Sequence, residues 1–353
     1  MRAAKPTMLN RYLDARVSLM AARLLREAEL PVLAEGSAEE RAAVLVRAGL
    51  SQTLADLEAG RYLEQSIIRS QLDDILILMR AAGEARRFLE YWTLRFELSN
   101  LKAILRAKVS HTPIAAVRKE LIDLGFLASL PVEDLLQTED VGELLRRLET
   151  THYADIVRFA RRAFEAQPQL FELDAALDRR FYHGLVELAR QHEAAFGKPF
   201  HSLMEMLIDR VNLVWLLRYR LLYKLPPSQV YYLLVPSHYR LSSTLLKELS
   251  VLNRFEEVVA ALPQPYRGWL AEADSVYRVF TVMDGKAARA AHVVLRSNAP
   301  GFARAFAYLI LRERDLKQVR AALKGQVLGL DTQTIRQAMG LAEVRNGAEA
   351  EAA

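Results

Sequence analysis

A twelve-residue segment occurs three times in this chain of 353 residues, and this repetition constrains the fold more than any other feature. The copies begin at Glu97, Asp209 and Asp315. Each runs in the order acid, two residues, amide, aliphatic residue, three residues, leucine, base. Self-similarity at a long and nearly constant period is typical of arrays of like structural units. The sequence therefore predicts three similar units in one chain.

The repeated frame also includes a phenylalanine twelve residues before the amide. Its members are Phe88, Glu97, Asn100, Leu101, Leu105, Phe200, Asp209, Asn212, Leu213, Leu217, Phe306, Asp315, Gln318 and Leu323. At 100° per residue the leucines fall on one buried stripe, with the acid and the amide to one side of it. Partly buried carboxylates and amides need hydrogen-bond partners. We expect them to fasten the edge of the core to a neighbouring helix end or loop, once per repeat.

Basic residues close the frame, and the first of them, Arg106, points away from the buried stripe. They are Arg106, Lys108, Arg218, Arg220 and Lys324. A base on the outer side of a helix meets solvent or another protein. These five side chains are therefore the candidates for polar contacts with a partner.

Apolar residues recur at intervals of three and four along nearly the whole chain, which predicts an all-α fold. The expected helices are 11–29, 63–81, 85–108, 113–125, 138–166, 170–195, 200–224, 241–262, 284–297 and 301–325, with Val230–Val235 as a possible exception. The predicted organisation is a flexible N-terminus at 1–10, repeats at 11–120, 121–232 and 233–343, and a disordered tail at 344–353. The repeats are expected to be helical bundles.

Composition narrows the functional classes. The chain has no cysteine, which removes disulfides, thiolate nucleophiles and cysteine-ligated zinc. Its net charge of +5 is spread among alternating acids and bases, as in Arg312–Asp315, which is typical of solvated helix faces rather than of nucleic-acid binding. No apolar run approaches the roughly 18 residues of a membrane span, and no secretory signal opens the chain. The prediction is a cytoplasmic protein.

The common signatures of chemistry are missing: no phosphate-binding loop, nucleophile elbow or zinc-helix motif occurs. Asp73-Asp74 is reminiscent of the magnesium site of helical isoprenoid synthases, but the further aspartate expected three residues on is Ile77. His201 and Glu205 lie one turn apart and could seat a metal, although an interhelical hydrogen bond is the favoured interpretation. We expect no catalytic residue, no metal and no cofactor.

The repeated segments resemble the C subunits of archaeal- and bacterial-type rotary ATPases (V-type and A-type ATP synthases), which correspond to the d subunits of vacuolar proton pumps. The resemblance rests on Tyr12–Val17, Asn100–Lys108, Leu177–Tyr182 and the stretch from Arg312 to Gly325. Together these segments span residues 12 to about 330. Gln318 and Gln326 in the third copy, and Pro236–His238 after the second, depart from the family pattern.

This resemblance implies a funnel of three helical domains around a pseudo-threefold axis and no catalytic site. In that family the protein lies on the cytoplasmic face of the membrane, on the rotor ring of proteolipid subunits. It receives the foot of the central stalk, made of D- and F-type subunits, and transmits torque between ATP turnover and proton or sodium transport. No nucleic acid and no small-molecule substrate are expected. Two alternatives stay open: a free helical scaffold or nucleic-acid-associated adaptor, and a helical magnesium-dependent lyase or transferase.

Overall fold

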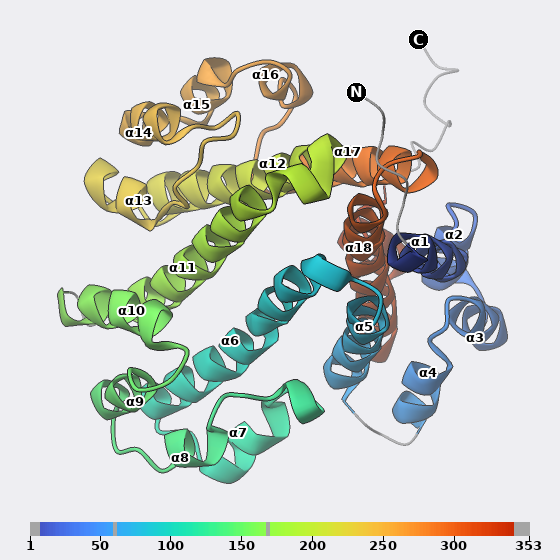
Figure 1. Cartoon of the computed structure of the whole chain (residues 1–353), viewed down its shortest axis with the longest axis horizontal. Coiled ribbons are helices and arrows are strands. Elements are labelled where there is room, and N and C mark those ends of the chain that lie inside the picture. The colour runs from blue at the N-terminus through green and yellow to red at the C-terminus, as the bar shows by residue number, and fades with distance from the viewer. Residues whose placement is uncertain (1–7, 59–61, 167–169, 342–353) are drawn as a thin grey trace.

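The computed structural model describes residues 8–58, 62–166 and 170–341, and every regular element in these ranges is a helix (Figure 1). The all-α prediction is confirmed. The tail expected at 344–353 lies outside the described residues, as does most of the N-terminal stretch expected at 1–10.

Three pairs of long helices form the frame of the molecule. The pairs are α5 (Leu63–Met79) with α6 (Arg86–Ser110), α11 (Leu170–Gln191) with α12 (Glu193–Leu217), and α17 (Val276–Arg296) with α18 (Gly301–Val327). The second helix of each pair contains one copy of the repeated segment, so we call α6, α12 and α18 the motif helices. Helix α6 also packs on α11, α12 on α17, and α18 on α5, which links the pairs in a closed order.

Short helices fill the connections between the pairs. After α6 come α7 (Ile114–Glu120), α8 (Val132–Leu136), α9 (Val141–Leu148) and α10 (Ala154–Ala166); after α12 come α13 (Pro227–Leu233), α14 (Ser243–Val251), α15 (Phe255–Ala261) and α16 (Tyr266–Trp269). Helix α19 (Thr332–Ala338) follows α18, and α1 (Met8–Ala21), α2 (Glu29–Glu35), α3 (Ala38–Arg47) and α4 (Ser51–Glu58) precede α5.

Several predicted helices are shorter or divided in the structure. The helix expected at 11–29 ends at Ala21, and the one expected at 241–262 is divided into α14 and α15. The expected helix 138–166 is interrupted between α9 and α10, where the hydroxyl groups of Thr150 and Thr151 donate to the backbone oxygens of Arg147 and Leu148 at 3.0 and 2.7 Å. Such local bonds compete with the helical ladder.

Two further differences concern single residues with special backbone preferences. The segment around Val230, predicted as a possible exception to the helical pattern, is the helix α13, which has a proline at its first position. Helix α12 bends at Gly197, whose φ of 76° favours glycine. A Cβ at this position would lie 3.2 Å from the ring of Pro300, just before α18.

The two ends of the chain share one hydrophobic core. Leu33 and Leu45 from the N-terminal helices are buried in the same cluster as Leu316 and Val319 of α18. Figure 1 shows the blue helices α1 to α5 beside the dark red α18, and α18 packs on α1, α2, α5 and α19. The C-terminal motif helix is therefore covered on one side by helices from the start of the chain, while α17 and α12 also pack on it.

A buried ion pair joins α5 to α18. The Nε of Arg312 lies 2.9 Å from Oδ2 of Asp74, and the hydroxyl of Tyr308 donates to the same oxygen at 2.8 Å. Arg312 is 1% exposed and Asp74 3% exposed. Asp74 is thus engaged as a structural partner, whereas its neighbour Asp73 is exposed.

Replacing Asp74 with alanine should strongly destabilise the fold, because it leaves the Arg312 guanidinium buried without its counter-charge. We expect the free energy of unfolding to fall by about 3–5 kcal/mol, measured by urea denaturation. The matched control is Asp73→Ala on the exposed side of the same helix, expected to stay within about 0.5 kcal/mol of the parent. Equal effects of the two variants would contradict a joining role for the pair.

Candidate functional site: the junction of the motif helices

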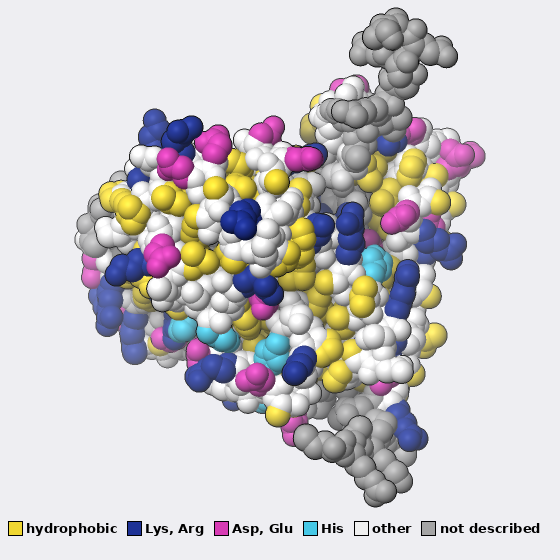
Figure 2. All heavy atoms as spheres, turned by 90° about the horizontal axis from the view of Figure 1, so that it is seen from above, with side chains coloured by type: hydrophobic (Ala, Val, Ile, Leu, Met, Phe, Trp, Pro, Cys, Tyr) yellow, Lys and Arg dark blue, Asp and Glu magenta, His cyan; other side chains and the backbone are white. Residues whose placement is uncertain are grey.

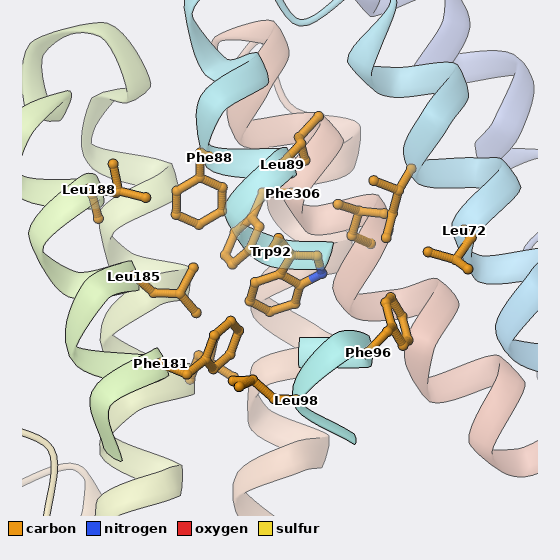
Figure 3. Close-up of a cluster of buried hydrophobic side chains, with 14 of the residues drawn as sticks. Leu72, Phe88, Leu89, Trp92, Phe96, Leu98, Phe181, Leu185, Leu188 and Phe306 are labelled. Carbon is orange, nitrogen blue, oxygen red and sulfur yellow. The ribbon is translucent and has the colours of Figure 1, made fainter. Parts of the chain in front are cut away.

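Three phenylalanines at matched positions of the repeat meet in one aromatic junction. The ring centroids of Phe88 and Phe200 lie 5.3 Å apart, those of Phe88 and Phe306 5.7 Å, and those of Phe200 and Phe306 4.9 Å. All three rings are at most 1% exposed. Figure 3 shows Phe88 and Phe306 facing each other, with Trp92 of α6 beside them. Residues more than a hundred positions apart in the chain therefore contact one another where the motif helices approach.

The geometry of this junction favours stable packing. Phe88 meets Phe200 and Phe306 edge to face, at interplanar angles of 84° and 88°, the arrangement that aromatic quadrupoles prefer. Phe196 and Phe302 add two more rings from α12 and α18. Leu185 and Leu188 of α11 lie on one side of the cluster in Figure 3. The motif helices are thereby held together by a dense apolar core at one point.

The repeated acids each accept a hydrogen bond from the backbone just before a short helix. The acids are Glu97, Asp209 and Asp315, and the donors are the N–H groups of Leu130, Leu241 and Leu25, at 3.2, 3.3 and 2.8 Å respectively. These leucines precede α8, α14 and α2. The hydroxyl of Ser129 adds a bond to Glu97 at 2.6 Å, and that of Tyr266 adds one to Asp209 at 2.7 Å.

The repeated amides bind backbone groups that follow another short helix. Asn100 donates to the oxygen of Ile122 at 2.9 Å and accepts from its N–H at 2.7 Å; Asn212 does the same with Val235 at 3.0 and 2.8 Å. In the third copy Gln318 donates to the oxygen of Met339 at 3.2 Å. The longer glutamine side chain thus contacts the corresponding place after α19 through a single bond among the described residues.

Burial raises the pKa of two of these acids. The pKa of Asp209 rises to about 7 because its carboxylate is desolvated, although the bonds from Tyr266 and Leu241 oppose the shift. The pKa of Asp315 likewise rises to about 7 through burial, opposed by the bond from Leu25. Both carboxyl groups therefore titrate near neutral pH in the folded chain.

The bases that close the frame divide into two groups. Lys108 donates to the backbone oxygen of Leu136 at 2.7 Å, and Arg220 donates to that of Val251 at 3.5 Å, so both reach the ends of short helices inside the chain. Gln326 at the same place in the third copy donates to Leu33 at 2.9 Å.

The other three bases are exposed. Among the described residues each has one polar side-chain partner: Arg106 has Asp174 at 3.4 Å, Arg218 has the Tyr223 hydroxyl at 3.1 Å, and Lys324 has Glu64 at 3.3 Å. Such surface contacts contribute little stability and leave the side chains accessible.

A collar of charged side chains lies next to the aromatic junction, and the repeat did not point to it. We define the collar as Arg95, Arg210, Asp284, Glu313, Arg314 and Lys317. Glu313 of α18 lies 2.7 Å from Arg95 of α6 and 2.8 Å from Lys317. Asp284 of α17 pairs with Arg210 of α12 and lies 3.6 Å from Arg314. These positions differ between the repeats, so only a side-by-side comparison of the residues around each acid would have drawn attention to them.

A cleft beside α6 contains no free acid pair. This cleft of about 760 Å³ is bordered by α6 and by Phe126, which is 80% exposed. Its carboxylates are engaged, Glu97 as described above and Glu90 with Arg86 at 2.8 Å. Elsewhere, Glu205 pairs with Arg240 at 3.0 Å rather than with His201.

The described residues offer neither a metal cluster nor a membrane span. Nowhere in residues 8–58, 62–166 and 170–341 do three histidine, aspartate or glutamate side chains gather closely enough to hold a metal ion. Among the helices of the described part of the chain, none has the length and apolarity needed to cross a membrane.

Comparison with known proteins decides the family. The model of the ATP synthase (C/AC39) subunit family matches residues 13–338, which includes all three motif helices. The chain belongs to this family. The resemblance found in the sequence is thereby confirmed.

Similar proteins within the family come from archaea and bacteria. The C subunit of the A-type ATP synthase of Methanothermobacter thermautotrophicus is 27% identical over 75% of this chain and 69% of its own length. Its counterpart from Methanocaldococcus jannaschii is 23% identical over 92% of this chain and 84% of its own length. The C subunit of the V-type ATP synthase of Deinococcus radiodurans is 25% identical over 51% of this chain and 53% of its own length. This chain is therefore a subunit of the rotary ATPase type.

The raised pKa values predict that stability declines as the pH rises. An aspartate with a folded pKa of about 7 and an unfolded pKa of about 3.9 binds more protons when folded, so its contribution is complete below about pH 4 and is lost as the pH rises through 7. We expect the variant Asp209→Asn with Asp315→Asn to show a flatter dependence between pH 5 and 8. The measurement is the free energy of unfolding from urea titrations at each pH.

The matched control is Glu257→Gln, an exposed acid, which should keep the parental pH dependence. Comparing variant with parent also cancels the opposite contributions of His183 and His292, whose pKa values burial lowers. An unchanged slope in the double variant would show that the two buried aspartates do not carry protons in the folded chain.

Proposed function

We propose that this chain is a non-catalytic central-stalk subunit of a V/A-type rotary ATPase, which seats the stalk on the membrane rotor ring and transmits torque. Membership of the C/AC39 family supports a place in a rotary ATPase complex. The junction of Phe88, Phe200 and Phe306 supports the mechanical role. A torque-transmitting part must resist deformation, and tightly packed interiors have low compressibility. The junction supplies such packing where the three motif helices approach.

In this proposal the chain forms three like units around the aromatic junction, in a funnel with a pseudo-threefold axis. Each unit has a motif helix, four short helices and a long helix. The series are α6 to α11, α12 to α17, and α18 and α19 followed by α2 to α5. Matching hydrogen bonds support this arrangement. The repeated acids bind the backbone just before α8, α14 and α2, and the repeated amides bind the backbone just after α7, α13 and α19. The third unit then draws on both ends of the chain, and all three predicted boundaries, 11–120, 121–232 and 233–343, are modified in this proposal.

The proposed partners are the D- and F-type stalk subunits on one side and the ring of proteolipid subunits on the other, at the cytoplasmic face of the membrane. Basic and acidic side chains are interspersed on the face drawn in Figure 2, which does not favour nucleic acid as a partner. Arg106, Arg218 and Lys324 are proposed as polar contacts, because all three are exposed and occupy the same place in the repeat.

The assembly can be tested by recovery of partners. A tagged chain expressed in its own host should bring down the D- and F-type stalk subunits and the proteolipid from detergent-solubilised membranes, identified by mass spectrometry. The isolated chain should show no ATP hydrolysis. Recovery of neither stalk nor ring would overturn the proposal.

The three exposed bases can be tested in the same experiment. We expect Arg106→Glu, Arg218→Glu and Lys324→Glu together to lower recovery of a partner at least fivefold, because the reversed charges repel its acidic groups. The control reverses Arg254 and Arg267, which are exposed elsewhere. Unaltered thermal unfolding would exclude a loss of fold, and recovery equal to that of the control would mean that these bases do not contact a partner.

A further inference from the structure

The motif helices are alike where they pack and unlike along one other stripe. On each motif helix this stripe consists of the residue two positions before the repeated acid and the residues two and five positions after it. These three positions lie on one face of a helix. It reads Arg95, Ser99, Lys102 on α6, then Leu207, Val211, Val214 on α12, and Glu313, Lys317, Arg320 on α18. One helix thus presents an apolar stripe, and the other two present charged ones.

The stripes of α12 and α18 begin at a shared recess beside the aromatic junction, which Leu207 and Glu313 line together with Trp92 of α6. The stripe of α6 begins at Arg95, which lies 2.7 Å from Glu313. Trp92 also contacts Phe306, with ring centroids 5.6 Å apart, and the guanidinium of Arg95 lies 4.4 Å above the Trp92 ring. Because the stripes start together at the junction, a helical partner that reached it would contact more than one of them.

The charged stripes border a second recess of about 260 Å³ between α5, α6 and α18. Its wall includes the apolar residues Ile67, Phe96 and Leu316, and its charged residues are Arg95, Glu313, Lys317 and Arg320. Three bases and one acid give this recess a local charge of +2. Arg320 is exposed and has no ion pair with any residue in the described ranges. The recess therefore suits an apolar segment that carries carboxylates.

The single acid of this recess, Glu313, already has two basic partners. Burial alone would raise the pKa of Glu313, but Arg95 and Lys317 outweigh burial and hold the pKa well below its usual range. Glu313 therefore stays ionised and paired. The three bases of the recess exceed this one acid, and Arg320 in particular is left to an incoming group.

The stripe of α12 offers the opposite chemistry. Leu207 is buried, and Val211 and Val214 are half-buried. Placing a carboxylate against Val211 and Val214 would remove water from it, and these apolar side chains offer no counter-charge, which is costly. An acidic segment is thus accepted between α6 and α18 and disfavoured along α12 from Leu207 to Val214, before the exposed base Arg218.

We propose that these unlike stripes orient a helical partner about the axis, with an acidic face toward the recess of α6 and α18 and an apolar face toward α12. This inference rests on the proposed function, in which the occupant is the foot of the central stalk. Three like units would otherwise accept that foot in three equivalent orientations. Specificity of this kind needs a penalty for the wrong placements as well as an attraction for the right one.

The orientation can be measured by cross-linking, because the chain contains no cysteine. Three single-cysteine proteins, Arg106→Cys, Arg218→Cys and Lys324→Cys, place a thiol at the same position of each motif helix. Each is assembled with its own D- and F-type subunits, with one cysteine introduced at the foot of the D-type partner, and treated with a bismaleimide. We expect one of the three positions to cross-link at least tenfold more than each of the others.

The variant Lys317→Val with Arg320→Val copies onto α18 the valines that α12 carries. In this background the foot should still bind, but the yields at the three cysteines should come within about threefold of one another. The matched control, Arg254→Val with Arg267→Val, removes two exposed bases outside the recess and should keep the tenfold preference.

The outcomes separate this inference from the proposed function. Absence of any complex between the parent chain and the stalk subunits would overturn the proposed function. A complex with equal cross-linking at all three cysteines would overturn the orientation inference alone. A strong preference that survives Lys317→Val with Arg320→Val would show that the charged recess does not set the orientation.

Discussion

Three phenylalanine rings from three long helices meet at one buried point, and the arrangement of the rest of the chain depends on this contact. Phe88, Phe200 and Phe306 lie close enough for each ring to touch the other two, so the helices that carry them must approach at that place. Aromatic rings bury a large area and have preferred mutual geometries. A junction of this kind therefore fixes both the distance and the relative rotation of the helices that form it.

Polar side chains extend this order from the junction to the short helices. Each repeated acid binds the start of one short helix and each repeated amide the end of another, so the connections are positioned by the motif helices themselves. In the third copy the partners come from the two ends of the chain: Leu25 binds Asp315, and Met339 binds Gln318. The buried pair of Asp74 and Arg312 strengthens the same closure between α5 and α18. The repeated side chains thereby connect the motif helices to the short helices, and the three helix pairs contact one another in a closed order.

Similar packing does not require similar surfaces. Core positions of the repeat must keep their volume and hydrogen-bond chemistry, whereas a stripe that faces outward can vary at little cost in stability. The motif helices use this freedom differently, with leucine and valines on α12 and charged residues on α18. In the proposed arrangement of three like units, such a difference would give the scaffold a direction about its axis. That property suits the proposed role, in which the chain turns together with the central stalk.

The sequence by itself determined the helical class, the three copies of the motif and the family, because periodicity and matched polar residues are local patterns. It also indicated that Glu97, Asn100 and their counterparts bind helix ends, since a buried polar group must be paired. Other features were decided only by the tertiary structure. Lys108 and Arg220 resemble Arg106 in the sequence but reach backbone oxygens inside the chain. The meeting of the three phenylalanines, the covering of one side of α18 by the N-terminal helices and the collar around Glu313 depend on contacts between residues far apart in the chain. No local pattern encodes such contacts, because they arise only when the helices pack.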